Sequence, residues 1–180
     1  MNSYVALIRA INVGGKNTLP MKELTEVLER IGCGNVKTYI QSGNVVFHSV
    51  LSAARLTEEI AAEIFRCRGF NPQVLVLEKS EFERAIDNNP FAEHESDPKS
   101  LHLGFLDSVP SSPDLQGLQA LRGPNERFEL IGRVFYLLAP DGVGRSKLAA
   151  KREEALGVPL TDRNWKTVGR IMSMLKEQDE

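Results

Sequence analysis

The stretch that decides the fold is residues 36–49, which read VKTYIQSGNVVFHS. Its two halves, 36–41 and 45–49, are rich in β-branched and aromatic residues, which favour extended strands. Between them stands Ser-Gly-Asn at 42–44, whose glycine and asparagine accept the backbone angles of a tight turn. The stretch therefore predicts a hairpin of two antiparallel strands.

A strand and a helix are expected on each side of this hairpin. Residues 4–11 form a short apolar run that leads into the glycines of INVGG, which is typical of a buried strand followed by a loop. From Pro20 to Gly32, apolar residues recur with the spacing of one helical face. After the hairpin, a second helix is expected to end near Gly69, and residues 74–77 form another strand. The first half therefore predicts the order β-α-β-β-α-β.

The second half repeats most of this order. A short helix at about 80–88 leads into NNPFAEHESDPKS, residues 88–100, whose polar residues and prolines indicate a connecting loop. The elements expected beyond it are a strand at 101–106, a helix near 113–121, strands at 128–131 and 134–138, and a helix at about 146–156. The last helix is expected to begin near Asp162, a residue type that suits an N-cap. Its expected buried stripe consists of Trp165, Val168, Met172 and Leu175.

The predicted fold class is α+β: two packed ferredoxin-like β-α-β-β-α units with antiparallel sheets, plus a C-terminal helix. The expected boundaries are residues 1–79 for the first α+β subdomain, 80–99 for the helix and connecting loop, and 100–180 for the second subdomain with its C-terminal helix. The repeated order of elements suggests a diverged duplication, although no residue-level repeat is visible.

Composition places the chain in the ordinary soluble globular class. Its apolar stretches are shorter than the roughly 20 residues that a membrane span needs, so we expect that the chain does not insert into a membrane. The start, MNSYVALIRAINVGG, lacks the basic segment and cleavage site of an export signal, so a cytoplasmic location is expected. Cys33 and Cys67 lie in no metal-binding spacing, and we expect plain thiols, no metal and no cofactor.

The charges are unevenly spread along the chain. The net charge of −2 argues against a protein whose whole surface is covered by bound nucleic acid. Residues 58–97 hold four Lys or Arg against ten Asp or Glu, whereas residues 145–170 hold seven against three. The second segment is therefore the basic end, where an anionic ligand is expected.

Three stretches carry a resemblance to a known family: residues 4–21 (YVALIRAINVGGKNTLPM), 36–47 (VKTYIQSGNVVF) and 144–175 (GRSKLAAKREEALGVPLTDRNWKTVGRIMSML). Together they resemble the bacterial domain-of-unknown-function family 1697, and the likeness extends over nearly the whole chain. The resemblance implies a two-part α+β structure, and it implies no reaction, ligand or catalytic residue. The chain departs from the family pattern at Ala10, where the resemblance leads us to expect glycine.

Two loops, 12–17 and 141–147, share a design that suits an anion. In each, a strand ends, a loop with glycines and a cation follows, and a helix begins. Converging backbone N–H groups and the positive end of a helix can hold a phosphate group. Neither loop matches a P-loop or a dinucleotide fingerprint, so the alternative is a simple structural turn.

Arg163, Lys166 and Arg170 are spaced at i, i+3 and i+7 in the segment expected to form the last helix. This spacing predicts a basic ridge along one face of that helix, beside Trp165. The alternative is a helix face that is merely solvated, which is the usual fate of charges on amphipathic helices.

Polar residues around the hairpin turn offer a further binding surface. Tyr39 and the neighbouring amide and hydroxyl groups can stack on and hydrogen-bond single-stranded bases, although packing within the hairpin is the alternative. Arg9 lies in the first apolar strand, and a cation in such a place needs a partner or a ligand.

We expect a binding protein for a phosphate-bearing ligand, either a nucleotide or a short single-stranded nucleic acid. One alternative is a small-molecule enzyme with a pocket between the two subdomains, and another is a protein-interaction module. His48, His94 and His102 belong to no recognisable nucleophile motif, so no catalytic residue is assigned. The candidate ligand-binding residues are Arg9, Asn12, Gly14, Gly15, Lys16, Gln41, Ser42, Asn44, Gly144, Arg145, Ser146, Lys147, Arg163, Asn164 and Lys166.

Overall fold

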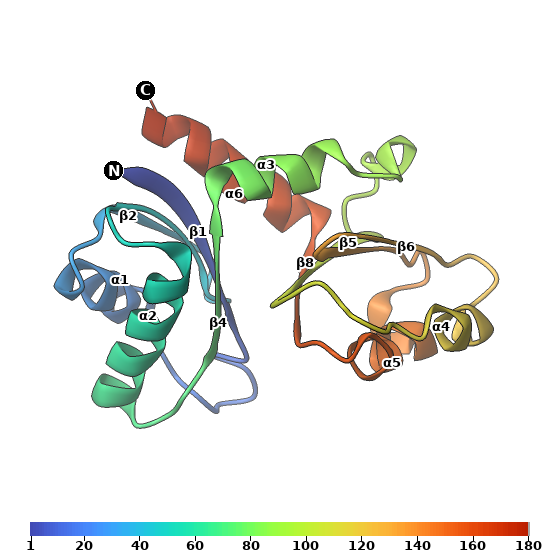
Figure 1. The fold of residues 1–180 in the computed structure, drawn as a ribbon, viewed down its shortest axis with the longest axis horizontal. Helices are drawn as coiled ribbons and strands as arrows, with labels where there is room; N and C mark the ends of the chain where they lie inside the picture. Colours follow the sequence, from blue (N-terminus) through green and yellow to red (C-terminus); the bar gives the residue numbers. More distant parts are fainter. Residues whose placement is uncertain (180) are drawn as a thin grey trace. The chain divides into compact units, whose positions relative to one another are not determined.

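The computed structural model describes residues 1–179, which fall into two units (Figure 1). The first unit contains Met1–Arg84 together with the described residues from Arg170 on, and the second contains Ala85–Gly169. Two helices therefore contribute residues to both units, α3 (Lys79–Asp87) and α6 (Trp165–Asp179). Among residues 1–179, the helices are too short or too polar to cross a membrane.

The first unit is a four-stranded antiparallel sheet with two helices. Its elements are β1 (Asn2–Arg9), α1 (Met21–Arg30), β2 (Gly34–Tyr39), β3 (Asn44–Ser49), α2 (Ala53–Arg68) and β4 (Gln73–Glu78). The strand order is β2-β3-β1-β4, so β1 is paired on both sides. The predicted hairpin is confirmed, because β2 pairs antiparallel with β3.

The second unit has the same topology. Its elements are β5 (Leu101–Leu106), α4 (Leu115–Leu121), β6 (Arg127–Ile131), β7 (Val134–Leu138), α5 (Lys147–Leu156) and β8 (Leu160–Asn164). The strand order β6-β7-β5-β8 reproduces that of the first unit strand for strand. Both units therefore have the ferredoxin-like β-α-β-β-α-β order with antiparallel sheets, which confirms the predicted fold class.

Strand β8 is the element that the sequence did not predict. We expected the segment to open the last helix with Asp162 as N-cap, and this prediction is wrong. Leu160 and Asp162 instead pair with Leu106 and Gly104 of β5. Helix α6 begins only at Trp165, where the Asn164 side chain accepts a hydrogen bond from the backbone N–H of Thr167 at 2.9 Å.

The buried stripe of α6 also differs from the predicted one. Val168 and Leu175 are buried as expected, whereas Trp165 and Met172 are only half-buried. Ile171, which lies between Val168 and Leu175, is buried.

Each sheet buries one face beneath its own two helices. In the first unit, alternate residues of β1 such as Tyr4 and Ala6 share a buried cluster with Leu28 of α1 and Ile60 of α2. Alternate residues of a strand point to the same side, which explains the pattern. In the second unit, the corresponding cluster contains Phe135 and Leu137 of β7, Leu118 of α4 and Leu148 and Leu156 of α5.

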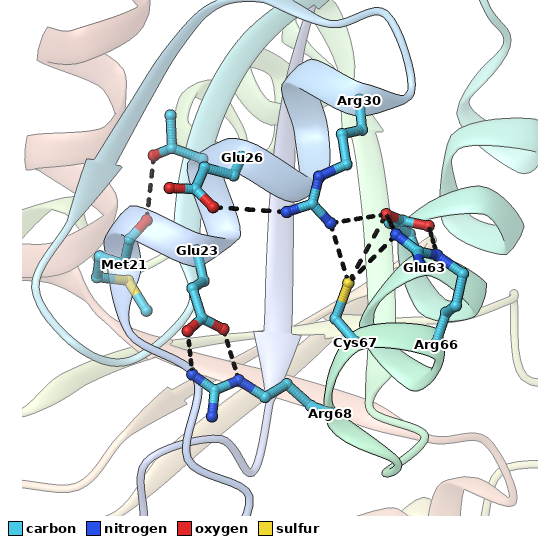
Figure 2. A network of polar contacts seen from close by, with 9 residues as sticks. Met21, Glu23, Glu26, Arg30, Glu63, Arg66, Cys67 and Arg68 are labelled. Atoms are coloured by element: carbon cyan, nitrogen blue, oxygen red, sulfur yellow. Dashed lines mark hydrogen bonds and ion pairs between the residues drawn. The ribbon is translucent and has the colours of Figure 1, made fainter.

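Polar contacts join α1 to α2 on the outside of this core (Figure 2). Glu23 pairs with Arg68, and Glu63 accepts hydrogen bonds from Arg66 and from Arg30, the latter at 3.0 Å. The hydrogen bond from Arg66 and that from Arg30 lower the pKa of Glu63 from 4.5 to about 2. The exposed thiol of Cys67 lies in the same network, where Arg30 donates to its sulfur at 3.0 Å.

The lowered pKa of Glu63 predicts a small stabilising contribution that depends on pH. Because the folded-state pKa lies below the unfolded value, this contribution is present above pH 4.5 and is lost as the pH falls toward 2. We expect Glu63→Gln to lower the free energy of unfolding at pH 7 by up to about 1 kcal/mol, since the partners are largely solvated. Urea unfolding of both proteins at pH 7 and pH 3 measures this loss. The difference in unfolding free energy between the wild type and Glu63→Gln must be smaller at pH 3 than at pH 7.

Glu58→Gln is the matched control for this experiment. Glu58 lies on the same helix, its side chain is 73% exposed, and its ion pair with Arg55 spans 3.8 Å. The control is expected to change the unfolding free energy little at either pH. Equal effects of the two substitutions would show that the Glu63 network contributes nothing beyond an ordinary surface charge.

Candidate functional site

The loop after β1 has an unusual backbone. Ala10, Asn12 and Asn17 have φ of 58°, 56° and 50°, in the left-handed region that favours glycine, and Gly14 and Gly15 lie there too. Lys16 donates a backbone hydrogen bond to Val13 across the tip at 3.1 Å. The predicted glycine loop therefore exists, and it is tightly folded.

Asn12 holds this loop against the hairpin loop. Its side-chain amide donates to the carbonyl oxygens of Leu19 and Gln41, each at 2.8 Å, and its oxygen accepts from the N–H of Leu19 at 2.8 Å. The backbone of Gly43 passes so close to β1 that a Cβ atom there would lie 2.6 Å from the carbonyl oxygen of Ile8. Asn12 therefore organises the loop, and its polar groups are all engaged internally.

Arg9, Ser42 and Asn44 have similar internal roles, whereas Gln41 is exposed and accepts from Asn12 only through its backbone carbonyl. Asn44 is buried and donates to the Tyr39 carbonyl and the Ser42 hydroxyl, and Arg9 donates to Gln73 at 3.2 Å. Lys16 is the exposed cation of the group, and its side chain has no polar partner among residues 1–179. The fold thus brings these predicted residues to one end of the sheet, but it leaves a single cation for a ligand.

The left-handed backbone at Ala10 predicts that Ala10→Gly stabilises the protein. The left-handed region costs an L-residue about 1–2 kcal/mol of conformational free energy, which glycine avoids. The greater freedom of glycine in the unfolded chain offsets part of this stabilisation. We expect a net increase of roughly 0.5–1 kcal/mol in the free energy of unfolding, measured by urea titration.

Ala62→Gly provides the control, because Ala62 is exposed and lies in the interior of helix α2. Glycine in a helix interior is expected to lower stability by about 0.5–1 kcal/mol. If both glycine substitutions destabilise the protein alike, the strain attributed to Ala10 is absent.

The second predicted loop lines a hollow within the second unit. The hollow has a volume of about 460 Å³. One side is formed by the end of α4 and the loop after it, residues 120–126, and the other by the loop before α5, residues 141–147. Arg145, Ser146 and Lys147, all predicted as site residues, belong to this lining.

Positive charge gathers around this hollow. The side chains of Arg145 and Lys147 are exposed and have no hydrogen-bond or ion-pair partner among the described residues 1–179. Arg122 reaches the hollow from the opposite side and donates to the carbonyl oxygen of Glu126 at 3.0 Å. The hydroxyl of Ser146 accepts from the N–H of Ala149 at 2.9 Å, so it caps α5 instead of facing a ligand. The first N–H groups of α5 lack helical acceptors and add positive character.

Two carboxylates complete the lining. Glu126 is only 8% exposed, and one of its oxygens accepts from the N–H of Gly123 at 2.8 Å. Asp141 accepts from the side chain of Asn125 at 3.2 Å. Both carboxylates therefore brace the walls of the hollow through hydrogen bonds. Neither forms an ion pair with the cations around it in the described part of the chain.

Sequence reasoning missed the α4 side of this hollow. Arg122 and Glu126 belong to the stretch LRGPNE, in which the Gly-Pro pair predicts a turn and nothing more. Its position opposite 141–147 follows from the pairing of β6 with β7 and the packing of α4 beside α5. A cation next to that turn was the available signal.

The predicted basic ridge on the last helix is wrong in one of its members. Arg163 lies in strand β8, so it cannot share a helical face with Lys166 and Arg170. Burial lowers the pKa of Arg163 to about 10, and its guanidinium donates to the carbonyl oxygen of Asp162 at 2.7 Å. Arg170 pairs with Glu177 at 2.8 Å, and Lys166 is exposed. The predicted ridge of three cations on one helix face is therefore wrong.

A charged network fixes β8 in the second unit. Asp162 binds the His102 ring at 2.7 Å through one carboxylate oxygen and Arg152 of α5 at 2.9 Å through the other. The second ring nitrogen of His102 lies 3.0 Å from the carbonyl oxygen of Lys99. Burial alone would raise the pKa of Asp162, but His102 and Arg152 outweigh it and lower the pKa. The contact between Arg152 and Asp162 is an ion pair without hydrogen-bond geometry, because both of its buried atoms lack a hydrogen-bond partner. The network joins β8 to β5 through His102 and to α5 through Arg152, so we assign it a structural role.

Removal of the Asp162 charge should therefore destabilise the second unit. Asp162→Asn leaves the half-buried cation of Arg152 without its partner, and we expect a loss of about 3 kcal/mol in unfolding free energy. Urea unfolding at pH 7 measures the loss. A change below about 0.5 kcal/mol would contradict the proposed role of the network.

Comparisons with known proteins support the fold but identify no ligand. A family model described as a protein of unknown function, DUF1697, matches residues 1–136, which include the INVGGKN and YIQSGNVVF runs. The conserved bacterial protein SP0830 from Streptococcus pneumoniae has a similar structure, with a TM-score of 0.69 and 29% sequence identity. That alignment covers 97% of this chain and 98% of the other. Nothing among the curated proteins matches the chain.

Proposed function

The chain belongs to the DUF1697 family, whose function is unknown, and we propose from its geometry that it binds a phosphate-bearing ligand in the hollow beside α5. The observation that carries this proposal is the pair of cations without partners, Arg145 and Lys147, at the N-terminus of a helix that lines a hollow. Phosphate oxygens accept hydrogen bonds from guanidinium, ammonium and backbone N–H groups together.

The hollow supports this function better than the glycine loop of the first unit does. In the loop at 10–17, Asn12 and Asn17 use their side chains to hold the backbone, which leaves Lys16 as its exposed cation. Around the hollow, Arg145, Lys147 and Arg122 approach one space from two sides. Several converging cations bind an anion more tightly than one solvated lysine, because each adds a charge-assisted hydrogen bond.

The size and the lining of the hollow fit a small ligand. A volume of about 460 Å³ lies within the range of about 300–1,000 Å³ found for small-molecule sites. The carboxylates of Glu126 and Asp141 are held by the loop, and they limit how much negative charge the hollow can accept. A ligand with one phosphate group therefore suits the hollow better than a long polyanion.

Charge reversal at the hollow tests the proposal. We expect Arg145→Glu with Lys147→Glu to weaken binding of a phosphate-bearing ligand at least about tenfold, because two charge-assisted contacts become repulsive. The measurement is fluorescence anisotropy of a fluorescently labelled nucleoside monophosphate at low and moderate salt. Competition by a nucleoside monophosphate and by inorganic phosphate shows which group is recognised. Circular dichroism verifies that the variant is folded.

The control variant is Lys16→Glu with Lys22→Glu, which makes the same change in net charge on the first unit. Both lysines are exposed, and Lys16 belongs to the competing glycine loop. We expect this variant to bind like the wild type at moderate salt. Loss of binding in the control, with binding retained in the Arg145 and Lys147 variant, would move the site to the first unit.

A further inference from the structure

We infer that the hollow continues into a second hollow, and that the two together accommodate a phosphate monoester of a ring-bearing alcohol such as a nucleoside. This inference rests on the proposed function. The second hollow has a volume of about 530 Å³ and lies between α4 and α5. Leu121 lines both hollows, so the two are adjacent on the surface of one unit.

The two hollows differ in chemistry. The lining of the second includes Gly117, Leu121 and Ala155, which carry no charge. The charged groups at its rim are paired: Lys151 donates to Glu154 at 2.7 Å, and Asp114 accepts from the N–H of Gly117 at 2.8 Å. A lining that combines uncharged residues with charged groups that are already paired suits the face of a ring, whereas the first hollow offers cations without partners.

Gly117 leaves room for the Asp114 side chain that caps α4. A Cβ atom at this position would lie 2.2 Å from the carboxylate of Asp114, so a side chain would displace the group that caps α4. The side chain of Leu121 is 37% exposed at the junction, which places an accessible apolar surface directly beside the cationic hollow. A ligand held by its phosphate at Arg145 and Lys147 therefore reaches Leu121 with its organic part.

This arrangement favours a single nucleoside phosphate over a nucleic-acid strand. Proteins that bind single strands stack successive bases on aromatic side chains along a basic groove. The linings of the two hollows contain no aromatic residue. The cations without an ion-pair partner lie at one end, since Lys151 at the other end is paired with Glu154.

The test compares three probes on the full chain: inorganic phosphate, ribose 5-phosphate and uridine 5′-monophosphate at equal ionic strength. Backbone amide shifts in NMR spectra report where each binds. We expect phosphate to shift amides at 142–148, and the nucleotide to shift amides at 112–117 and 151–155 as well. The nucleotide should also bind about fivefold more tightly than ribose 5-phosphate, an effect of about 1 kcal/mol of apolar burial.

Leu121→Ala is the informative variant and Leu115→Ala is its control. Leu115 lies on the same helix and is 38% exposed, but it lines neither hollow. We expect Leu121→Ala to remove the fivefold preference for the nucleotide over ribose 5-phosphate, and Leu115→Ala to retain that preference. Thermal unfolding of both variants shows that they are folded.

The outcomes separate this inference from the proposed function. If phosphate and nucleotide bind equally, with shifts confined to 142–148, the second hollow takes no ligand and only the proposed function stands. If no probe shifts any amide, both are overturned. If an oligonucleotide binds far more tightly than the mononucleotide and shifts amides outside both hollows, the ligand is a strand and the inference fails.

Discussion

Each unit depends on two inner strands that are hydrogen-bonded on both sides, β3 and β1 in the first unit and β7 and β5 in the second. With all neighbours antiparallel, one face of each sheet is left to the two helices of its unit. In the second unit this arrangement sets the end of α4 beside the start of α5. The hollow is therefore a consequence of the topology, and its chemistry is decided by the residues in two short connections.

The two units share this topology but differ in the connections. Both second helices begin with a serine cap, Ser52 in α2 and Ser146 in α5. The connection before α2 is only residues 50–52, whereas the connection before α5 covers residues 139–146 and carries Arg145. The longer connection forms a wall of the hollow in the second unit. This difference fits the general rule that binding residues lie on loops while the scaffold stays constant.

The sequence predicted the strands whose pattern was clean, such as the hairpin of β2 and β3. Strand β8 was not predictable, because Asp162, Arg163 and Asn164 look like the start of a helix. Their strand conformation depends on His102 and on Arg152, which lie 60 and 10 positions away in the chain. These tertiary contacts override the local preference for a helix. The pattern of a single sequence does not reveal which distant residues will make such contacts.

The residues of the candidate site were likewise only partly predictable from the sequence. Arg145 and Lys147 were identified because a glycine loop with cations precedes an expected helix, and the helix starts where predicted. Asn12 was selected by the same pattern, yet its side chain holds the loop instead of facing solvent. The pattern finds positions where a backbone turns sharply, and only the fold determines whether the polar side chains there are used internally.

The charges at the start of α5 are themselves an argument for a ligand. A helix is stabilised by acidic residues in its first turn, and cations there are unfavourable by a few tenths of a kcal/mol each. The first turn of α5 contains no acidic residue, and Lys147 stands at its first position with Arg145 two residues before. No carboxylate of the described chain pairs with either cation, so the protein itself does not neutralise them. An arrangement that disfavours the helix in isolation becomes favourable once an anion occupies the hollow, which is the behaviour expected of a binding site.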